Sequence, residues 1–163
     1  MNNDIHIRAA EIDDVPIILF FIQALADYEK LSHEVVATED DLRMSLFGDP
    51  KAKQAEVIIA SSAGKDIGFA LYFHTYSTFL GRAGMWLEDL FVLPEARGTG
   101  AGKKLLSHLA KIAKDRQCGR LEWSVLNWNE PSIKFYRSLG ATPMDEWTTY
   151  RLHGQALDDL ANS

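Results

Sequence analysis

Cysteine is nearly absent from this sequence, which contains only Cys118 among 163 residues. A single thiol forms no disulfide within the chain, provides no cysteine cluster for a metal, and is typical of a reducing compartment. The longest apolar run, residues 15–26, is interrupted by Gln23 and is shorter than the roughly 20 residues that cross a bilayer. The first residues, MNNDIHIR, lack the basic-then-apolar arrangement of a secretory signal. We therefore expect a cytoplasmic protein without membrane association.

The isolated histidines and the uneven charge distribution argue against two further classes of function, metal binding and nucleic-acid binding. His74 and His108 have no second histidine at ligand spacing, which argues against a metal site. Residues 1–50 hold eleven acidic and three basic side chains, which argues against nucleic acid as a partner. Residues 97–120 hold seven basic side chains and one acidic side chain. These regions suit two ligands of opposite charge, and they also suit solvated helix faces.

Hydrophobic periodicity and turn residues predict one domain, residues 1–163, of the α/β class. The predicted strands are 5–8, 54–61, 67–76, 84–93, 121–126 and 147–152. The predicted helices are approximately 13–31, 38–48, 100–117, 131–139 and 155–160. Short turns make the middle strands antiparallel, whereas the helix of 100–117 has the right length for a crossover between parallel strands. The sheet should therefore be mixed, mostly antiparallel, with helices on both faces.

A glycine-rich turn, RGTGAGK at residues 97–103, lies between a predicted strand and a predicted helix. A dinucleotide-binding fingerprint would need glycine at position 103, and a P-loop would need glycine at position 97; these positions hold lysine and arginine. Glycine has no side chain to keep a ligand off the backbone, and the amides of a first helical turn attract anions. The turn thus predicts a pyrophosphate site, with tight strand–helix packing as the alternative.

Two motifs resemble those of the GNAT superfamily of N-acetyltransferases. Residues 90–102, LFVLPEARGTGAG, contain a pattern similar to the family's acetyl-CoA motif R/Q-x-x-G-x-G/A. Residues 127–141, NWNEPSIKFYRSLGA, resemble its second cofactor motif. The strings LEDLFV, WNEPSI and ADYE are similar to those of diamine (spermidine/spermine) and thialysine acetyltransferases. The resemblance, over about residues 5–155, implies a GNAT-like sheet with a splayed cofactor cleft, acetyl-CoA as cosubstrate, no metal and a homodimer.

The resemblance implies that Glu88 draws the proton from the amine and that Tyr136 protonates the leaving thiolate. Glu88 and Asp89 lie in an otherwise apolar strand, MWLEDLFVL, where a carboxylate is costly unless it has a partner or a task. The alternative for each is a salt bridge or an exposed strand edge. Because successive strand residues face opposite sides, we expect the two carboxylates to point apart. Ser132 and Tyr136, four residues apart, should share one helix face.

The remaining implied contacts fall into a cofactor group and an amine group. The cofactor group comprises Leu90, Phe91, Val92, Arg97, Gly98, Thr99, Gly100, Ala101, Gly102, Lys103, Asn129 and Ser132, and the amide near Phe91 or Val92 is expected to face the thioester oxygen. The amine group comprises Asp27, Tyr28, Glu29, Glu88, Asp89, Glu122, Trp123 and Ser124. A solvated helix end is the alternative for Asp27 and Glu29.

We expect an N-acetyltransferase that transfers the acetyl group of acetyl-CoA to a small cationic amine by direct attack in a ternary complex. Polyamines and diamines are the leading acceptors, because several ammonium groups suit an acidic and aromatic channel. Thialysine or lysine-like amino acids, amines of proteins, and a non-catalytic sensor of acyl-CoA are the alternatives. The physiological amine, the preferred acyl chain and the dimer geometry are left open by the sequence.

Overall fold

The computed structural model describes residues 4–163, which divide after residue 124 into two compact units. The strands of the described chain are β1 (Ile5–Ala9), β2 (Glu56–Ser62), β3 (Lys65–Ser77), β4 (Arg82–Val92) and β5 (Leu121–Trp123). Its α-helices are α1 (Val15–Glu29), α2 (Glu39–Phe47), α3 (Ala101–Asp115), α4 (Glu130–Ser138) and α5 (Gly154–Ala161). All five strands and α1 to α3 belong to the first unit, whereas α4 and α5 belong to the second.

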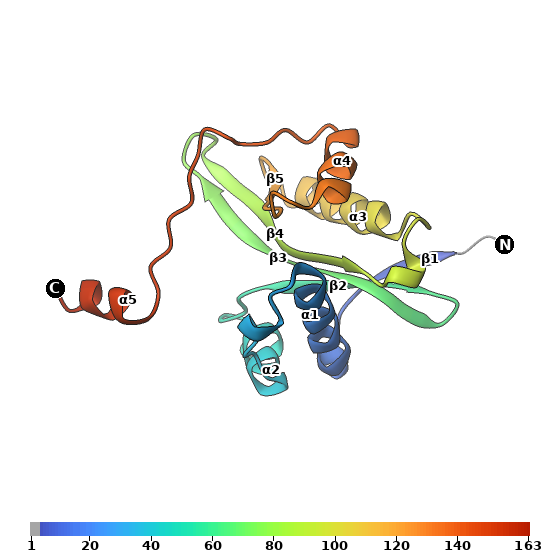
Figure 1. The fold of residues 1–163 in the computed structure, drawn as a ribbon, viewed down its shortest axis with the longest axis horizontal. Coiled ribbons are helices and arrows are strands. Elements are labelled where there is room, and N and C mark those ends of the chain that lie inside the picture. Colours follow the sequence, from blue (N-terminus) through green and yellow to red (C-terminus); the bar gives the residue numbers. More distant parts are fainter. Residues whose placement is uncertain (1–3) are drawn as a thin grey trace. The chain divides into compact units, whose positions relative to one another are not determined.

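The five strands form one sheet in the order β1-β2-β3-β4-β5. The first four are antiparallel neighbours, and β5 is parallel to β4 because α3 carries the chain back across the sheet. Helices α1 and α2 cover one face, and α3 covers the other (Figure 1). The prediction of a mixed, mostly antiparallel sheet with helices on both faces is thus confirmed.

Aromatic packing joins α1 to the sheet. Phe21 is fully buried, and its ring stacks on that of Phe69 in β3 with centroids 5.4 Å apart. Val15 and Ile18 of α1 are also fully buried in this core, which includes Phe91 of β4. Burial of such side chains is worth about 1.5–3 kcal/mol each, which explains the strongly apolar sequence of α1. This packing fixes the end of α1 relative to the end of β4, where the candidate site lies.

The predicted start of α2 is confirmed in detail. Thr38 is the N-cap, and its hydroxyl oxygen accepts a hydrogen bond from the Asp41 N–H at 3.2 Å. The Asp41 carboxylate in turn accepts from the Thr38 N–H at 2.8 Å, which completes a capping box. The helix ends at Gly48, as expected from the sequence.

The second unit, residues 125–163, differs from the prediction. The predicted strand 147–152 is wrong, because this stretch is irregular and the described unit contains no strand. A strand needs a neighbour to satisfy its backbone groups, and this unit offers none. Trp147 and Tyr150 are 72% and 91% exposed. The predicted strand 121–126 is also shorter than expected, because β5 ends at Trp123.

No helix of the described chain is long and apolar enough to cross a membrane.

Candidate active site

Glu88 lies at a β-bulge in β4. Leu71 of β3 is opposite Asp89, and the next residue, Tyr72, is opposite Leu87. Glu88 is therefore an extra residue in β4, and it is exposed. A bulge interrupts the alternation of side chains and re-aims those beside it. We expected the carboxylates of Glu88 and Asp89 to point to opposite faces because residues alternate in a regular strand. The bulge interrupts that alternation, so the argument does not apply at Glu88.

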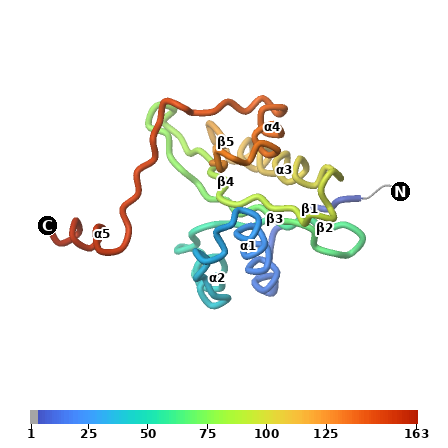
Figure 2. The backbone as a smooth tube through the Cα atoms, in the orientation of Figure 1, coloured from blue at the N-terminus to red at the C-terminus, as the bar shows by residue number. Residues whose placement is uncertain are grey.

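The outer edge of β4 is paired over only part of its length. Strand β5 pairs with residues 85–87, where the Met85 N–H donates to the Arg120 carbonyl at 2.9 Å. From Glu88 to Val92, no described strand of residues 4–124 pairs with this edge. Beyond its pairing with β5, β4 continues toward the glycine turn that precedes α3 (Figure 2).

The main-chain register shows which groups face this unpaired edge. The Leu93 N–H donates to the Ile67 carbonyl at 2.9 Å, so residue 93 faces β3. Because antiparallel strands alternate between pairs that exchange hydrogen bonds and pairs that do not, Phe91 also faces β3. Leu90 and Val92 then direct their amides and carbonyls to the outer edge. This edge can accept an extended chain in the manner of an added strand.

The glycine turn exposes the amides at the start of α3. Gly98 and Gly100 have φ angles of 77° and 92°, a left-handed conformation that favours glycine. Gly100 is the N-cap of α3 and offers no side chain to cap the helix. The Lys104 N–H bonds back to the Gly100 carbonyl at 2.9 Å, whereas the amides of residues 101–103 precede the first intrahelical bond. The partial positive charge at this helix end suits an anion.

Neither the backbone conformation nor the packing of Gly102 requires a glycine. Its φ is not positive, and a Cβ built there would meet only the Val92 Cγ2, at 3.9 Å, which is an ordinary contact. The protein therefore leaves space at Gly102 for a ligand to approach the backbone. Lys103 is exposed beside it. Lys104 is engaged elsewhere, because its ammonium donates to the Ile5 carbonyl of β1 at 3.2 Å.

The side chain of Arg97 connects the glycine turn to α1. Its Nε–H donates to the Val92 carbonyl at 3.1 Å, which occupies one acceptor on the outer edge of β4. Its guanidinium lies over the Tyr28 ring, 4.8 Å from the centroid, and 5.6 Å from that of Phe91. Such cation–π contacts contribute about 0.5–1 kcal/mol at exposed sites. Arg97 thus positions a residue of the predicted amine group, although its motif belongs to the cofactor group.

Three carboxylates gather where α1 ends beside β4. Burial, followed by the charges of Glu88 and Glu29, raises the pKa of Asp89 to about 6. Burial also raises the pKa of Glu29. Asp27 is exposed and accepts a hydrogen bond from the Ser32 hydroxyl. The structure therefore brings Glu29, Glu88 and Asp89 close enough to interact, whereas Asp27 has a local partner at the helix end.

Replacing Asp89 by asparagine should stabilise the fold at neutral pH. Because its pKa is about 6 in the folded protein, against an ordinary 3.8, ionisation of Asp89 lowers stability as the pH rises from about 4 to about 6, and the whole loss is present above pH 6. We expect Asp89→Asn to increase the free energy of unfolding by about 3 kcal/mol at pH 7.5 and by about half as much at pH 5. Urea unfolding at both pH values measures this. The exposed Asp13→Asn is the control, and an equal gain at the two pH values would contradict the assignment.

The amine-group residues of β5 lie beside the same part of β4. Trp123 is in register with Leu87, and Glu122 with Trp86. The Glu122 carboxylate forms an ion pair with Arg120, with 2.8 Å between Oε2 and Nε, so part of its charge is already compensated. Ser124 follows β5 and is exposed. The strand therefore places two of the predicted residues in register with the segment that precedes the bulge.

The predicted residues of the second unit lie on or before α4. Asn129 is buried and caps the helix, with its Oδ1 accepting from the Ser132 N–H at 3.4 Å. Ser132 and Tyr136 are both half-buried, and the Tyr136 ring lies 5.5 Å from that of Phe135 between centroids. Asn129 thus has a structural task in addition to its predicted cofactor contact.

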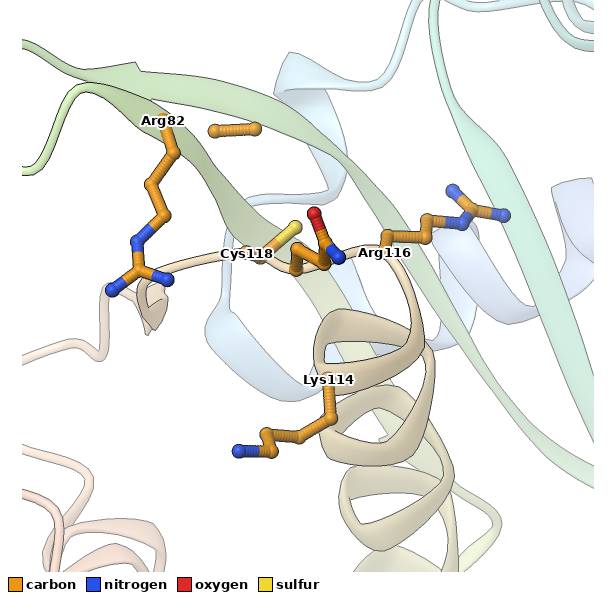
Figure 3. Close-up of a pocket in the computed structure, with 6 residues that line it drawn as sticks. Arg82, Lys114, Arg116 and Cys118 are labelled. Atoms are coloured by element: carbon orange, nitrogen blue, oxygen red, sulfur yellow. The ribbon is translucent and has the colours of Figure 1, made fainter.

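A depression elsewhere in the first unit has a volume of about 560 Å³ (Figure 3). It lies at the C-terminal end of α3 and is lined by Arg82, Ala83, Lys114, Arg116, Gln117 and Cys118. Arg116 is ion-paired with Glu56, whose carboxylate accepts from the second guanidinium nitrogen at 3.0 Å. The depression shares no residue with the predicted site. No group of three potential metal-ligating side chains occurs among residues 4–163.

Sequence reasoning missed one contact of Glu88. The indole N–H of Trp86 donates to the Glu88 Oε2 at 2.8 Å. The spacing of two residues along a strand could have indicated this contact, because such residues share a face of the sheet. Nothing in the sequence indicated that Arg97 would turn toward Tyr28.

Comparisons with known proteins agree with these features. Residues 22–141 match a family model described as the acetyltransferase (GNAT) family. A thialysine N-epsilon-acetyltransferase of Bos taurus is 38% identical over 164 residues, which span 95% of this chain and 96% of that protein. Spermidine/spermine N(1)-acetyltransferase-like protein 1 of Homo sapiens is 32% identical across 95% of this chain, which spans 23% of that protein. A solved integron cassette protein of V. cholerae has a TM-score of 0.78 at 33% identity, covering 98% of both chains.

Proposed function

We propose, given that this chain belongs to the acetyltransferase (GNAT) family and is an N-acetyltransferase, that its acceptor is the terminal primary amine of a small cationic molecule. Acetyl-CoA, the cosubstrate of this family, supplies a thioester whose acyl carbon is open to attack. The acceptor class comprises aliphatic amines that carry a second charged group, such as thialysine, lysine and diamines.

The observation that carries this proposal is that Glu29 and Glu88 lie close enough to Asp89, beside the bulge of β4, for their charges to raise its pKa. Burial and mutual repulsion raise the pKa of Asp89 to about 6, so the cluster costs stability when the protein is empty. A cationic ligand would neutralise these carboxylates, which is a physical reason for keeping them together. Small amines with two charged groups suit such a cluster better than an uncharged amine does.

The unpaired edge of β4 supports acetyl-CoA binding. The outward-facing groups of Leu90 and the Val92 N–H suit an extended pantetheine arm, and the amides of residues 101–103 suit the diphosphate. Arg97 already occupies the Val92 carbonyl. Because the Phe91 amide faces β3, the Val92 N–H is the better donor for the oxyanion that forms on the thioester. In this proposal Asn129 and Ser132 complete the cofactor contacts.

The proposed reaction is a direct transfer without a covalent enzyme intermediate. The amine nitrogen attacks the acyl carbon, the carbon–sulfur bond breaks, and an amide and a thiolate form. Glu88 accepts the proton that the amine loses, through an ordered water, and Tyr136 returns a proton to the thiolate. Because Glu88 is exposed and its indole contact uses only one carboxylate oxygen, the other oxygen is available to accept.

Within this acceptor class, we place thialysine-like amino acids ahead of polyamines. The Bos taurus relative that carries the thialysine name is 38% identical over nearly the whole of both chains, whereas the spermidine/spermine-like relative is 32% identical. The acidic residues also favour a short acceptor, because the charge of Glu122 is compensated by Arg120. Fewer uncompensated carboxylates then remain for the several ammonium groups of a polyamine.

A thiol-release assay with acetyl-CoA tests the proposed acceptor class. The panel contains thialysine, lysine, its shorter homologue ornithine, putrescine, spermidine and a lysine-containing peptide. We expect kcat/KM for the best small amine to exceed that for the peptide by about 100-fold, since the peptide blocks the second charged group. A peptide used as well as the small amines would instead favour a protein acetyltransferase. Binding of CoA without thiol release for any amine would favour a sensor of acyl-CoA.

Exposed apolar residues in the second unit support a homodimer. Trp147, Tyr150 and Met144 are 72%, 91% and 60% exposed, and Leu157 and Leu160 of α5 are 50% and 60% exposed. Several exposed large apolar side chains within one short segment favour an interaction surface, and we assign it to a second copy of the chain. We also propose a cytoplasmic location, with which the single cysteine is consistent.

A further inference from the structure

Trp86 contacts Glu88 within one strand. The two residues lie on either side of Leu87, Glu88 being the extra residue of the bulge, and the Trp86 Nε1–H donates to the Glu88 Oε2 at 2.8 Å. The backbone of Trp86 is paired on both sides, since Trp86 is opposite Phe73 on β3 and in register with Glu122 on β5. A half-buried ring between two neighbouring strands is a rigid anchor for an exposed carboxylate.

We propose that Trp86 is a positioning residue for Glu88, an inference that rests on the proposed function. An exposed glutamate at a bulge samples several rotamers, and ordering its side chain costs entropy. A charge-assisted hydrogen bond from a fixed indole removes this freedom and leaves Oε1 to accept the proton of the amine. The indole only donates, so it holds the carboxylate without competing for that proton. Trp86 itself touches neither substrate.

A purely structural Trp86 would behave differently. Buried indole N–H groups generally find a hydrogen-bond partner, so the contact could serve only to satisfy the tryptophan. In that case its loss would lower stability and leave turnover unchanged. A positioning role instead couples the two side chains: removing the indole matters only while residue 88 is a base.

The test is a double-mutant cycle with Trp86→Phe and Glu88→Gln, assayed on the best small amine of the panel. We expect Trp86→Phe to lower kcat about 10-fold with little change in the KM for the amine, and Glu88→Gln to lower kcat about 100-fold. The double variant should stay within about twofold of Glu88→Gln alone. Trp86→Tyr keeps an aromatic ring with a donor and should recover most of the turnover.

Phe73→Leu is the matched control, because it disturbs the packing around Trp86 and leaves the N–H in place. This variant should have a lower melting temperature, but it should not show the loss of kcat of about 10-fold that is expected for Trp86→Phe. If the wild type turns over and Trp86→Phe has an unchanged kcat, this inference alone is overturned. The same holds if the kcat losses of the two single variants multiply in the double variant. Absence of wild-type turnover with every amine would overturn the proposed function as well, so the two failures are distinguishable.

Discussion

Tyr136→Phe is expected to lower kcat for the best small amine by about 100-fold or more, with little change in the affinity for CoA. General-acid catalysis contributes about 10²–10⁴-fold, and phenylalanine removes only the hydroxyl that would protonate the thiolate. The ring remains, so its packing against Phe135, with centroids 5.5 Å apart, is kept. Steady-state thiol release measures kcat, and calorimetric titration with CoA measures binding.

Tyr150→Phe is the control for this prediction. Tyr150 belongs to the same unit and is 91% exposed, so loss of its hydroxyl should leave both kcat and CoA binding unchanged. Turnover in Tyr136→Phe within about threefold of the wild type would remove Tyr136 from the mechanism. A parallel loss of CoA binding would instead assign the tyrosine to the cofactor.

Gly102→Glu should stabilise the fold and weaken CoA binding. Glutamate at the start of α3 replaces a poor helix former and interacts favourably with the helix dipole, which together increase the free energy of unfolding by about 1 kcal/mol. The same carboxylate lies where we place the diphosphate. Repulsion of about 3 kcal/mol between the two anions corresponds to an affinity about 100-fold lower. Urea unfolding and calorimetric titration with CoA measure the two effects, which have opposite signs.

Gly102→Ala separates charge from side-chain size. A Cβ at this position meets only Val92 Cγ2, at 3.9 Å, so alanine fits the protein itself. We expect a stability gain of about 0.5–1 kcal/mol and CoA affinity within about fivefold of the wild type. An unchanged affinity in Gly102→Glu would show that the diphosphate binds elsewhere.

The elements of the first unit were largely predictable because local physics dictates them. The apolar run of α1 needs burial on several sides, and the structure buries Val15, Ile18 and Phe21 completely. Thr38 and Asp41 form a capping box at the predicted start of α2, a motif that a spacing of three residues favours. The irregular structure of residues 147–152 was not predictable from the sequence. Alternating apolar and polar residues indicate a strand, but they do not indicate whether a partner strand exists.

The candidate site was predictable in its residue types and less so in its geometry. The sequence indicated the glycine turn, and Gly98 and Gly100 adopt the left-handed conformation that glycine allows. The bulge at Glu88 depends on the register between β3 and β4, and the sequence of β4 alone does not determine this register. The meeting of Glu29 with Asp89 depends on tertiary packing across sixty residues of chain. The roles assigned to these residues stay predictions.

The most direct test is to titrate ¹⁵N-labelled protein with CoA and follow the backbone amide resonances of the glycine turn. If the start of α3 binds the diphosphate, the amides of residues 98–103 should show the largest shift changes, and those of the depression at the opposite end of α3 should show almost none. Saturable CoA binding that leaves the resonances of residues 98–103 in place would contradict the account.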